Sequence, residues 1–444
     1  MGLNGEGARV RVFMLGWEFP PFISGGLGTA CYGLTKALDE LGVKVTFVLP
    51  KMVDSQYATH VKLLTPQARK NAKTRRIRKS LDEELTNVKF RSILSPLQAY
   101  ATPQTYDEKV AEILRRKREA ATTPGQACDP SGGGPTDYAG DLYREIHRYA
   151  SMAVELSRDE EFDVIHAHDW MTYPAGIGVA MASGKPLVVH IHSTEFDRSG
   201  EHVNQVVYDI EREGMHRASK VIAVSHFTRG VVISRYGIPG DKVEVVYNGV
   251  ERNGTWSTAP VTIRREEKIV LFLGRITMQK GPEYFLQAAK KVLDVMDNVK
   301  FVMAGSGDLM YRSIELAAQL GIGHKVLFTG FLRGDDVRRI FRMADLYVMP
   351  SVSEPFGIAP LEALDNDVPV IISKQSGVSE VLRHALKVDF WDINEMANKI
   401  AAVLKYPPLR MTLRNHGNFE VRKLRWRDAA RNCLRIYEET LVPV

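Results

Sequence analysis

Short apolar runs alternate along most of the chain with longer stretches in which apolar residues recur every three or four positions. The runs at 9–15, 43–50 and 162–170 open this alternation, and the run at 268–281 restarts it in the second half. Short buried runs are typical of strands, and the spacing between them is that of amphipathic helices. The pattern predicts an α/β protein with two Rossmann-like, doubly wound domains built on parallel sheets.

Interruptions of this pattern set the predicted domain boundaries. We predict a first domain over 1–253, a polar linker near 251–265 and a second domain over 254–424. Residues 52–138 break the alternation and are interpreted as an insertion in the first domain. The last stretch, 425–444, has the apolar spacing of one further helix.

Composition points to a soluble globular protein. Of the 444 residues, 44% are apolar and 25% are charged. The first residues lack the long apolar core of a signal peptide, and no apolar run reaches the length of a bilayer span. Three scattered cysteines form neither a disulfide framework nor a metal cluster. We therefore expect a cytoplasmic location.

The net charge of +6 is unevenly spread, because the predicted insertion has no acidic residue between Ser55 and Leu81. This basic run suits a phosphate, a phosphorylated glucan or an anionic membrane surface. A solvated insertion without a ligand is the favoured interpretation. No aromatic residues are interleaved with its basic positions, so nucleic acid is not expected as a partner.

The stretch 350–362, PSVSEPFGIAPLE, follows a strand-type run and leads into helical spacing. Its loop therefore lies at the carboxyl end of a strand, where open α/β sheets bind ligands. Glu354 and Glu362 are eight residues apart, which is too far for a metal pair on one helix face. The spacing suits two points on one elongated ligand. The alternative is a surface helix start with two solvated acids.

Cations follow another predicted strand in the second half. Arg275 and Lys280 lie just after the apolar run that begins at Lys268, where a guanidinium fork and an ammonium suit a diphosphate. The alternative is two solvated cations. In the first half, a glycine loop between the first strand and the first helix would let backbone approach a phosphate. Its glycines are Gly25, Gly26 and Gly28, and they do not form the dinucleotide fingerprint G-x-G-x-x-G.

Histidines end two strands of the first half. Alternation puts His166 and His168 on one face of their strand, beside Asp169. No third ligand lies near in sequence, so a zinc site is poorly supported. His192 ends the next strand and, with the charged residues that follow it, is a candidate for lining an acceptor site.

Taken together, the motifs PP-x3-GGLG, H-x-H-D-W, G-R-x4-K-G and E-x7-E around PFG resemble those of retaining glycosyltransferases with the GT-B architecture. Glycogen and starch synthases and the large group 1 family share that architecture. The resemblance implies two Rossmann-like domains that face each other across a cleft, with the helix at 425–444 packed back on the first. It also implies retaining transfer of a hexose, with glucose as the first expectation, from a nucleotide-diphosphate sugar to a glycan or sugar acceptor.

The resemblance implies roles for individual residues. His168 would lie under the transferred sugar, Arg275 and Lys280 would stabilise the departing diphosphate, and Glu354 would face the donor hydroxyls. Asp169 and His192 would lie on the acceptor side. The donor and nucleotide would contact Gly25, Gly26, Gly28, Gly305, Ser306, Phe356, Gly357, Ile358 and Glu362. No metal ion and no cofactor are expected.

The substrate stays open. Ile23 and Ser24 stand where bacterial glycogen synthases usually carry a lysine, and Ser376 and Asp367 stand where glycines are common. An α-glucan synthase using ADP-glucose or UDP-glucose is the first expectation. A group 1 enzyme that makes a cell-envelope glycan or a small glucoside is the alternative. A nucleotide-sugar epimerase, a glycan phosphorylase and a non-catalytic glycan-binding scaffold are less favoured.

Overall fold

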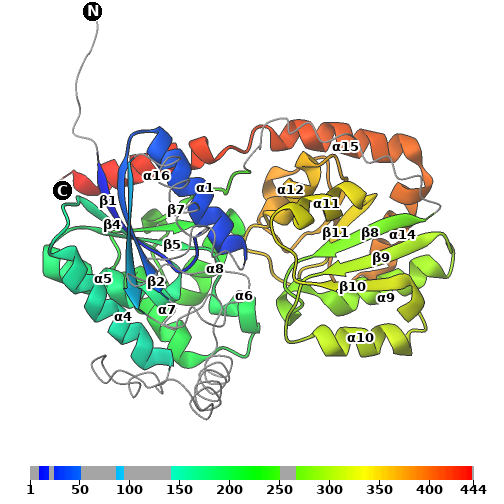
Figure 1. Ribbon diagram of the computed structural model, residues 1–444, viewed down its shortest axis with the longest axis horizontal. Coiled ribbons are helices and arrows are strands. Elements are labelled where there is room, and N and C mark those ends of the chain that lie inside the picture. Colours follow the sequence, from blue (N-terminus) through cyan, green and yellow to red (C-terminus); the bar gives the residue numbers. More distant parts are fainter. Residues whose placement is uncertain (1–9, 20–24, 52–86, 95–141, 251–266, 443–444) are drawn as a thin grey trace, which may run out of the picture. The chain divides into compact units, whose positions relative to one another are not determined.

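The computed structural model describes residues 10–19, 25–51, 87–94, 142–250 and 267–442 (Figure 1). The predicted linker and most of the predicted insertion lie outside these residues, and the predicted domain boundaries stay a prediction. By its contacts the chain divides into two compact units. Unit 1 contains Met1–His190, Glu213–Lys220 and Leu434–Val444, and unit 2 contains Ile191–Arg212 and Val221–Cys433.

A seven-stranded sheet forms the centre of the first half of the chain, with strand order β3-β2-β1-β4-β5-β6-β7. Strands β1, β4 and β5 are buried along nearly their whole length, so both faces of the sheet are covered. The order reverses between β1 and β4, and doubly wound sheets bind ligands at the carboxyl ends of strands at such a point. The strands are β1 Arg11–Leu15, β2 Lys44–Lys51, β3 Val88–Leu94, β4 Val164–His168, β5 Leu187–Ile191, β6 Lys220–Ala223 and β7 Val243–Val245.

The helices between these strands supply the covering layers (Figure 1). Helices α4 and α5 pack against each other. Strand β3 lies within the predicted insertion and pairs in parallel with β2, so this part of the insertion extends the sheet. The helices are α1 Gly26–Glu40, α4 Leu142–Ser157, η2 Trp170–Thr172, α5 Tyr173–Ser183, α6 Glu195–Ser199, α7 Gln205–Arg217, α8 His226–Tyr236 and η3 Gly240–Lys242.

A six-stranded parallel sheet forms the centre of the second half, with strand order β10-β9-β8-β11-β12-β13. The order in which strands are added reverses between β8 and β11. The loops that follow these two strands carry Arg275 and Lys280 in one case and Glu354 in the other. The strands are β8 Lys268–Leu273, β9 Val299–Ala304, β10 Val326–Gly330, β11 Leu346–Met349, β12 Val370–Ser373 and β13 Leu386–Val388.

Alternating side chains of this second sheet enter two hydrophobic clusters. Val270 and Phe272 of β8 pack in one cluster with α9 and α14, whereas Ile269 and Leu271 pack in the other with α12. The helices of this half are η4 Met278–Lys280, α9 Pro282–Leu293, α10 Met310–Gln319, η5 Gly323–Lys325, α11 Asp335–Met343, α12 Ala359–Asp365, α13 Val378–Val381, α14 Ile393–Lys405, α15 Pro407–Val421 and α16 Trp426–Leu441.

The predicted fold class is confirmed, because the chain contains two doubly wound parallel sheets with helices. Each sheet places the loops of two predicted motifs at its point of reversal. Among the described helices, none is both long and apolar enough to span a bilayer.

Candidate active site

An ion pair lies at the reversal point of the second sheet. Lys280 Nζ is 2.5 Å from Glu354 Oε2, and the two side chains are only 21% and 10% exposed. Ser351 Oγ donates a hydrogen bond to the same carboxylate oxygen at 3.2 Å. The structure therefore brings together two of the predicted catalytic residues from loops 74 residues apart in sequence.

The Lys280 loop depends on a glycine. After β8 the chain forms the turn η4, which ends at Lys280, and Gly281 then takes a φ of 65°. A Cβ at Gly281 would lie 2.2 Å from the carbonyl oxygen of Pro350, so only glycine lets this turn approach the loop after β11. Arg275, in the segment between β8 and η4, donates to Gln279 Oε1 at 3.4 Å.

Backbone hydrogen bonds hold the loop that carries Glu354. The amide of Val352 donates to Gln279 O at 2.9 Å, the amide of Glu354 donates to Gln375 O at 3.0 Å, and the amide of Gly377 donates to Glu354 O at 2.9 Å. Gly357 has a φ of 103°, so the loop turns into α12 through a conformation that favours glycine. Phe356 is buried, and Ile358 is the N-cap residue of α12.

Glu362 lies in the first turn of α12. Withdrawal of its carboxyl from water raises the pKa of Glu362 to about 7, while Arg338 lowers it and Asp365 raises it further. Sequence reasoning missed Tyr347, a buried residue of β11. Burial raises the pKa of Tyr347 well above its usual range, and the nearby Glu354 and Glu362 raise it further. A tyrosine within an otherwise aliphatic strand is the sequence signal that could have indicated it.

The predicted nucleotide-binding turn follows β9. Gly305 has a φ of 143°, and a Cβ there would lie 1.8 Å from the carbonyl oxygen of Gly274. The amide of Gly305 donates to Gly330 O at 2.9 Å, and Ser306 O accepts from Ile276 N at 2.9 Å. The turns after β8, β9 and β10 are therefore linked at the carboxyl edge of the sheet.

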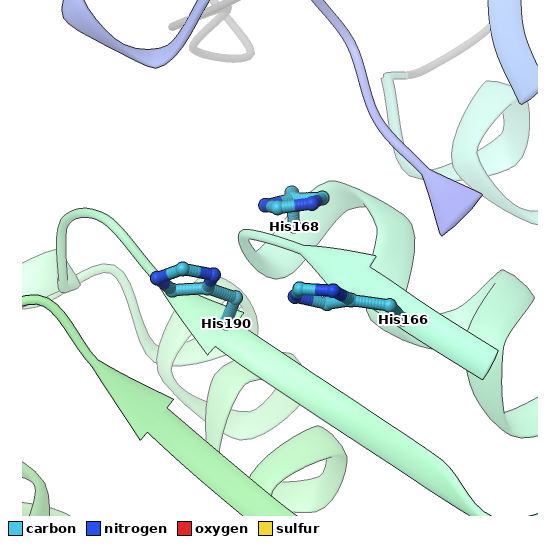
Figure 2. Close-up of side chains that lie close together, drawn as sticks. All are labelled: His166, His168 and His190. Carbon is cyan, nitrogen blue, oxygen red and sulfur yellow. The ribbon is translucent and has the colours of Figure 1, made fainter. Parts of the chain in front are cut away.

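Three buried histidines meet at the carboxyl ends of β4 and β5, beside the reversal point of the first sheet (Figure 2). His166 and His168 end β4, and the neighbouring strand β5 contributes His190 opposite His168. Sequence analysis found no third histidine near in sequence, but the pairing of β4 with β5 supplies one. Tyr437 of α16 shares a hydrogen bond of 2.6 Å with His166 Nδ1.

The arrangement of these rings is that of a stack. The His166 and His168 rings lie 4.2 Å apart with 25° between their planes, and the His166 and His190 planes differ by 11°. One nitrogen from each ring lies within 4.8 Å of the corresponding nitrogens of the other two. A tetrahedral zinc needs ligand atoms about 3.3 Å apart, with in-plane lone pairs that converge on one point. The three ring planes lie 11° to 30° from one another, so the rings are roughly parallel and would have to turn to bind one ion.

Asp169 adopts a strained backbone immediately after the stack. Its φ is 59°, and its amide donates to His190 O at 3.0 Å. The Thr172 hydroxyl shares its one proton between the carbonyl oxygens of His168 and Asp169, both at 2.9 Å. A buried aspartate with positive φ is uncommon and is found most often at functional sites.

The predicted glycine loop is partly wrong, because α1 begins at Gly26 and so contains Gly26 and Gly28. Gly25 is the N-cap residue, and residues 20–24 lie outside the described part of the chain. The amide of Gly28 donates to Glu18 Oε2 at 2.9 Å, and Glu18 is 2% exposed. The Glu18 carboxylate, from the loop after β1, thus binds the first turn of α1. The glycines at this point were predicted to bind a phosphate. Sequence reasoning missed Glu18.

On the predicted acceptor side, burial lowers the pKa of His192 to about 3, which keeps its ring neutral. The charged residues that follow were expected in a loop, but they form α6. Arg198 Nη2 lies 2.5 Å from the buried Glu211 Oε1, and Arg198 Nε donates to Glu195 Oε2 at 3.1 Å. These side chains therefore bind one another within unit 2.

Two family descriptions match the chain. "Glycosyl transferases group 1" matches residues 257–418, and "Glycosyltransferase Family 4" matches residues 121–253. An uncharacterized glycosyltransferase of Methanocaldococcus jannaschii is 35% identical over 297 residues, which are 63% of this chain and 76% of that protein. A D-inositol 3-phosphate glycosyltransferase of Salinispora tropica is 28% identical over 310 residues, which are 63% of this chain and 64% of that protein.

A solved structure extends the likeness to both sheets. The sucrose-phosphate synthase of Thermosynechococcus elongatus superposes with a TM-score of 0.68 at 19% sequence identity, over 97% of this chain and 99% of that chain. At 19% sequence identity this similarity shows a shared fold and no more.

Substitution of Gly281 by alanine should destabilise the protein by at least about 2 kcal/mol, because of the positive φ and the close Pro350 carbonyl. Gly230→Ala is the matched control. Gly230 is exposed within α8, a Cβ there meets nothing within 4 Å, and alanine should stabilise by up to about 1 kcal/mol. Urea unfolding measures both changes. Similar values for the two variants would contradict the close approach at Gly281.

Glu362→Gln should stabilise the protein at pH 8 by about 1–3 kcal/mol and have little effect at pH 4.5. The folded pKa of about 7 exceeds the ordinary value of 4.5, so the folded state pays for an ionised carboxylate above pH 7. As the pH falls from 7 to 4.5, the folded wild-type protein keeps a proton on Glu362 that the unfolded chain lacks. The difference in stability between Glu362→Gln and the wild type therefore disappears. Urea unfolding at several pH values tests this, with the exposed Glu315→Gln as control. A gain independent of pH would contradict it.

Proposed function

Because the chain belongs to the group 1 glycosyltransferases, a family of transferases with the GT-B fold, we propose that it transfers a hexose from a nucleotide-diphosphate sugar to a glycan acceptor. Glucose is the first candidate hexose, and transfer retains the anomeric configuration. The observation that carries the proposal is the Lys280–Glu354 ion pair at the reversal point of the second sheet.

In this proposal, Lys280 and Glu354 exchange each other for groups of the donor when the donor binds. Lys280 and Glu354 are both largely withdrawn from water, and separating such charges without new partners would be costly. A nucleotide sugar offers phosphate oxygens to Lys280 and sugar hydroxyls to Glu354. As the glycosidic bond breaks, negative charge develops on the diphosphate, which Lys280 and Arg275 stabilise.

The proposal gives roles to the other predicted residues as well. Glu362, in its ionised form, accepts hydrogen bonds from the ribose hydroxyls, and the turn at Gly305 and Ser306 contacts the base. His168 lies under the transferred sugar, beside Asp169. The acceptor hydroxyl attacks from the face that the diphosphate leaves. Glu354 is bound by Lys280 and Ser351, which suits a residue that binds hydroxyls rather than a covalent nucleophile.

Two acceptor classes are candidates. An α-glucan is the first, from the resemblance of the motifs to those of glycogen and starch synthases. A phosphorylated polyol is the second, because a relative at 28% identity is named a D-inositol 3-phosphate glycosyltransferase. The absence of the lysine from positions 23 and 24 favours the broader family.

The deciding experiment is nucleotide release from ADP-glucose, UDP-glucose, GDP-mannose and UDP-N-acetylglucosamine. Each donor is tested alone, with maltooligosaccharides and with inositol phosphate, and Glu354→Ala serves as control. Release that depends on maltooligosaccharides, with chain extension, supports an α-glucan synthase. Release that depends on inositol phosphate supports the second acceptor. Epimerisation without an acceptor, or no turnover of any donor, would contradict the proposed transfer.

Lys280→Ala should lower kcat by about 100-fold to 1000-fold with a small change in the donor KM, because its charge matters most as the leaving group forms. Lys280→Gln, which keeps a donor for Glu354, separates the loss of charge from the loss of packing. Lys291→Ala, which changes an exposed lysine of α9, is the control. A rise in KM alone would remove Lys280 from leaving-group stabilisation.

Transfer should survive EDTA, because Arg275 and Lys280 supply the positive charge for the diphosphate. The measurement is the initial rate before and after chelation, followed by addition of Mg²⁺ or Mn²⁺. Complete loss of activity that either ion restores would refute metal independence.

A further inference from the structure

The residue next to Glu354 is held by a side chain from a distant segment of unit 2. Ser353 Oγ donates a hydrogen bond of 2.5 Å to Asp197 Oδ1, across 156 residues of sequence. On the other side of Glu354, the carbonyl oxygen of Pro355 accepts from Ser225 Oγ at 2.6 Å and from Thr228 Oγ1 at 3.2 Å. Both neighbours of Glu354 are therefore fixed by residues outside its own loop.

Asp197 is itself held rigidly. It is 3% exposed, and its other oxygen, Oδ2, accepts from the amide of Thr194 at 2.7 Å and from the Thr194 hydroxyl at 2.8 Å. The amide of Asp197 donates in return to Thr194 Oγ1 at 3.4 Å, and this bond and the one from the Thr194 amide form a capping box that fixes the first turn of α6. One carboxylate thus has two functions: Oδ2 caps α6, and Oδ1 binds the Glu354 loop.

Helix α6 is anchored on its other side as well. Arg198 bridges Glu195 and Glu211, and Arg198 Nη1 donates to Ser193 O at 3.1 Å. Tyr236 of α8 also donates to Glu211. The helix packs against η4, the turn that ends at Lys280. Helix α6 therefore contacts both η4, which ends at Lys280, and the loop that contains Glu354.

We infer that Asp197 is a positioning residue, which acts through Ser353 to hold Glu354 in place opposite Lys280. The inference rests on the proposed function. A hydrogen bond to a buried carboxylate is stronger than one between neutral groups, so it resists displacement of the loop. Loss of this bond leaves the backbone bonds of the loop but allows Glu354 to shift, and displacements near 1 Å can cost about 100-fold in rate.

The test uses Ser353→Ala, because this change removes the bond and leaves the capping box of α6 intact. It should lower kcat about tenfold, change the donor KM by less than about threefold, and leave the affinity for the free nucleoside diphosphate unchanged. Ser353→Thr keeps a hydroxyl and should restore most of the rate. The affinities come from titration calorimetry with ADP or UDP, according to the donor that is turned over.

A double-mutant cycle with Asp197→Asn tests whether the effect of Ser353→Ala on kcat depends on Asp197. Once Asp197 is changed, Ser353→Ala should cause little further loss of kcat. Ser313→Ala is the control for loss of a buried hydroxyl. Ser313 Oγ donates to Leu309 O at 2.8 Å within α10, so this change should leave kcat unaltered.

Three outcomes would overturn the inference. A wild-type kcat in Ser353→Ala, or a lowered melting temperature alone, would make the contact merely structural. Additive losses in the cycle would separate Ser353 from Asp197. A wild-type protein that neither turns over nor binds any nucleotide sugar would overturn the proposed function and this inference with it. The last result is distinct, because it is seen before any variant is compared.

Discussion

The candidate site depends on one constraint: an ammonium and a carboxylate, both largely withdrawn from water, must stay together. Lys280 and Glu354 lie on different loops, so the fold has to fix the distance between those loops. Gly281 allows one backbone to approach the Pro350 carbonyl, Ser351 adds a hydrogen bond, and the amides of Val352 and Glu354 bind neighbouring carbonyls. Because either charge alone would be costly to bury, a ligand must replace both partners together. A phosphorylated sugar meets that requirement.

Strand order decides where such groups can meet. In each sheet the order reverses between two central strands, β1 and β4 in the first and β8 and β11 in the second. The loops that follow such strands diverge and leave a crevice at the sheet edge. The second sheet puts the ion pair there. The first sheet has the three histidines beside that point, and in the loop after β1 the Glu18 carboxylate binds the amide of Gly28. The two edges therefore differ in chemistry although they share a topology.

The second-sheet motifs could be predicted from sequence because each lies in one loop between a strand and its following helix. Local spacing places Arg275, Lys280, Glu354 and Glu362 just after their strands, whereas their roles rest on the resemblance to glycosyltransferases and stay a prediction. Contacts between distant segments carry no such signal. His190 joins the stack through the register of β4 with β5, Tyr437 reaches His166 from the last helix, and Asp197 reaches Ser353. The start of α1 was misplaced because glycines suggested a loop, whereas the first turn of a helix tolerates them when a carboxylate binds its free amides.

The two acceptor candidates differ in the charge that they require. A glucan offers hydroxyls, which neutral imidazoles and backbone groups can bind, and His192 stays neutral because burial lowers its pKa to about 3. A phosphorylated polyol needs cations, and Arg198 is already bound by Glu195 and Glu211. The sequence has a separate source of positive charge in the basic run between Lys62 and Lys79. A phosphorylated acceptor would therefore need a cation other than Arg198, whereas a glucan would need none.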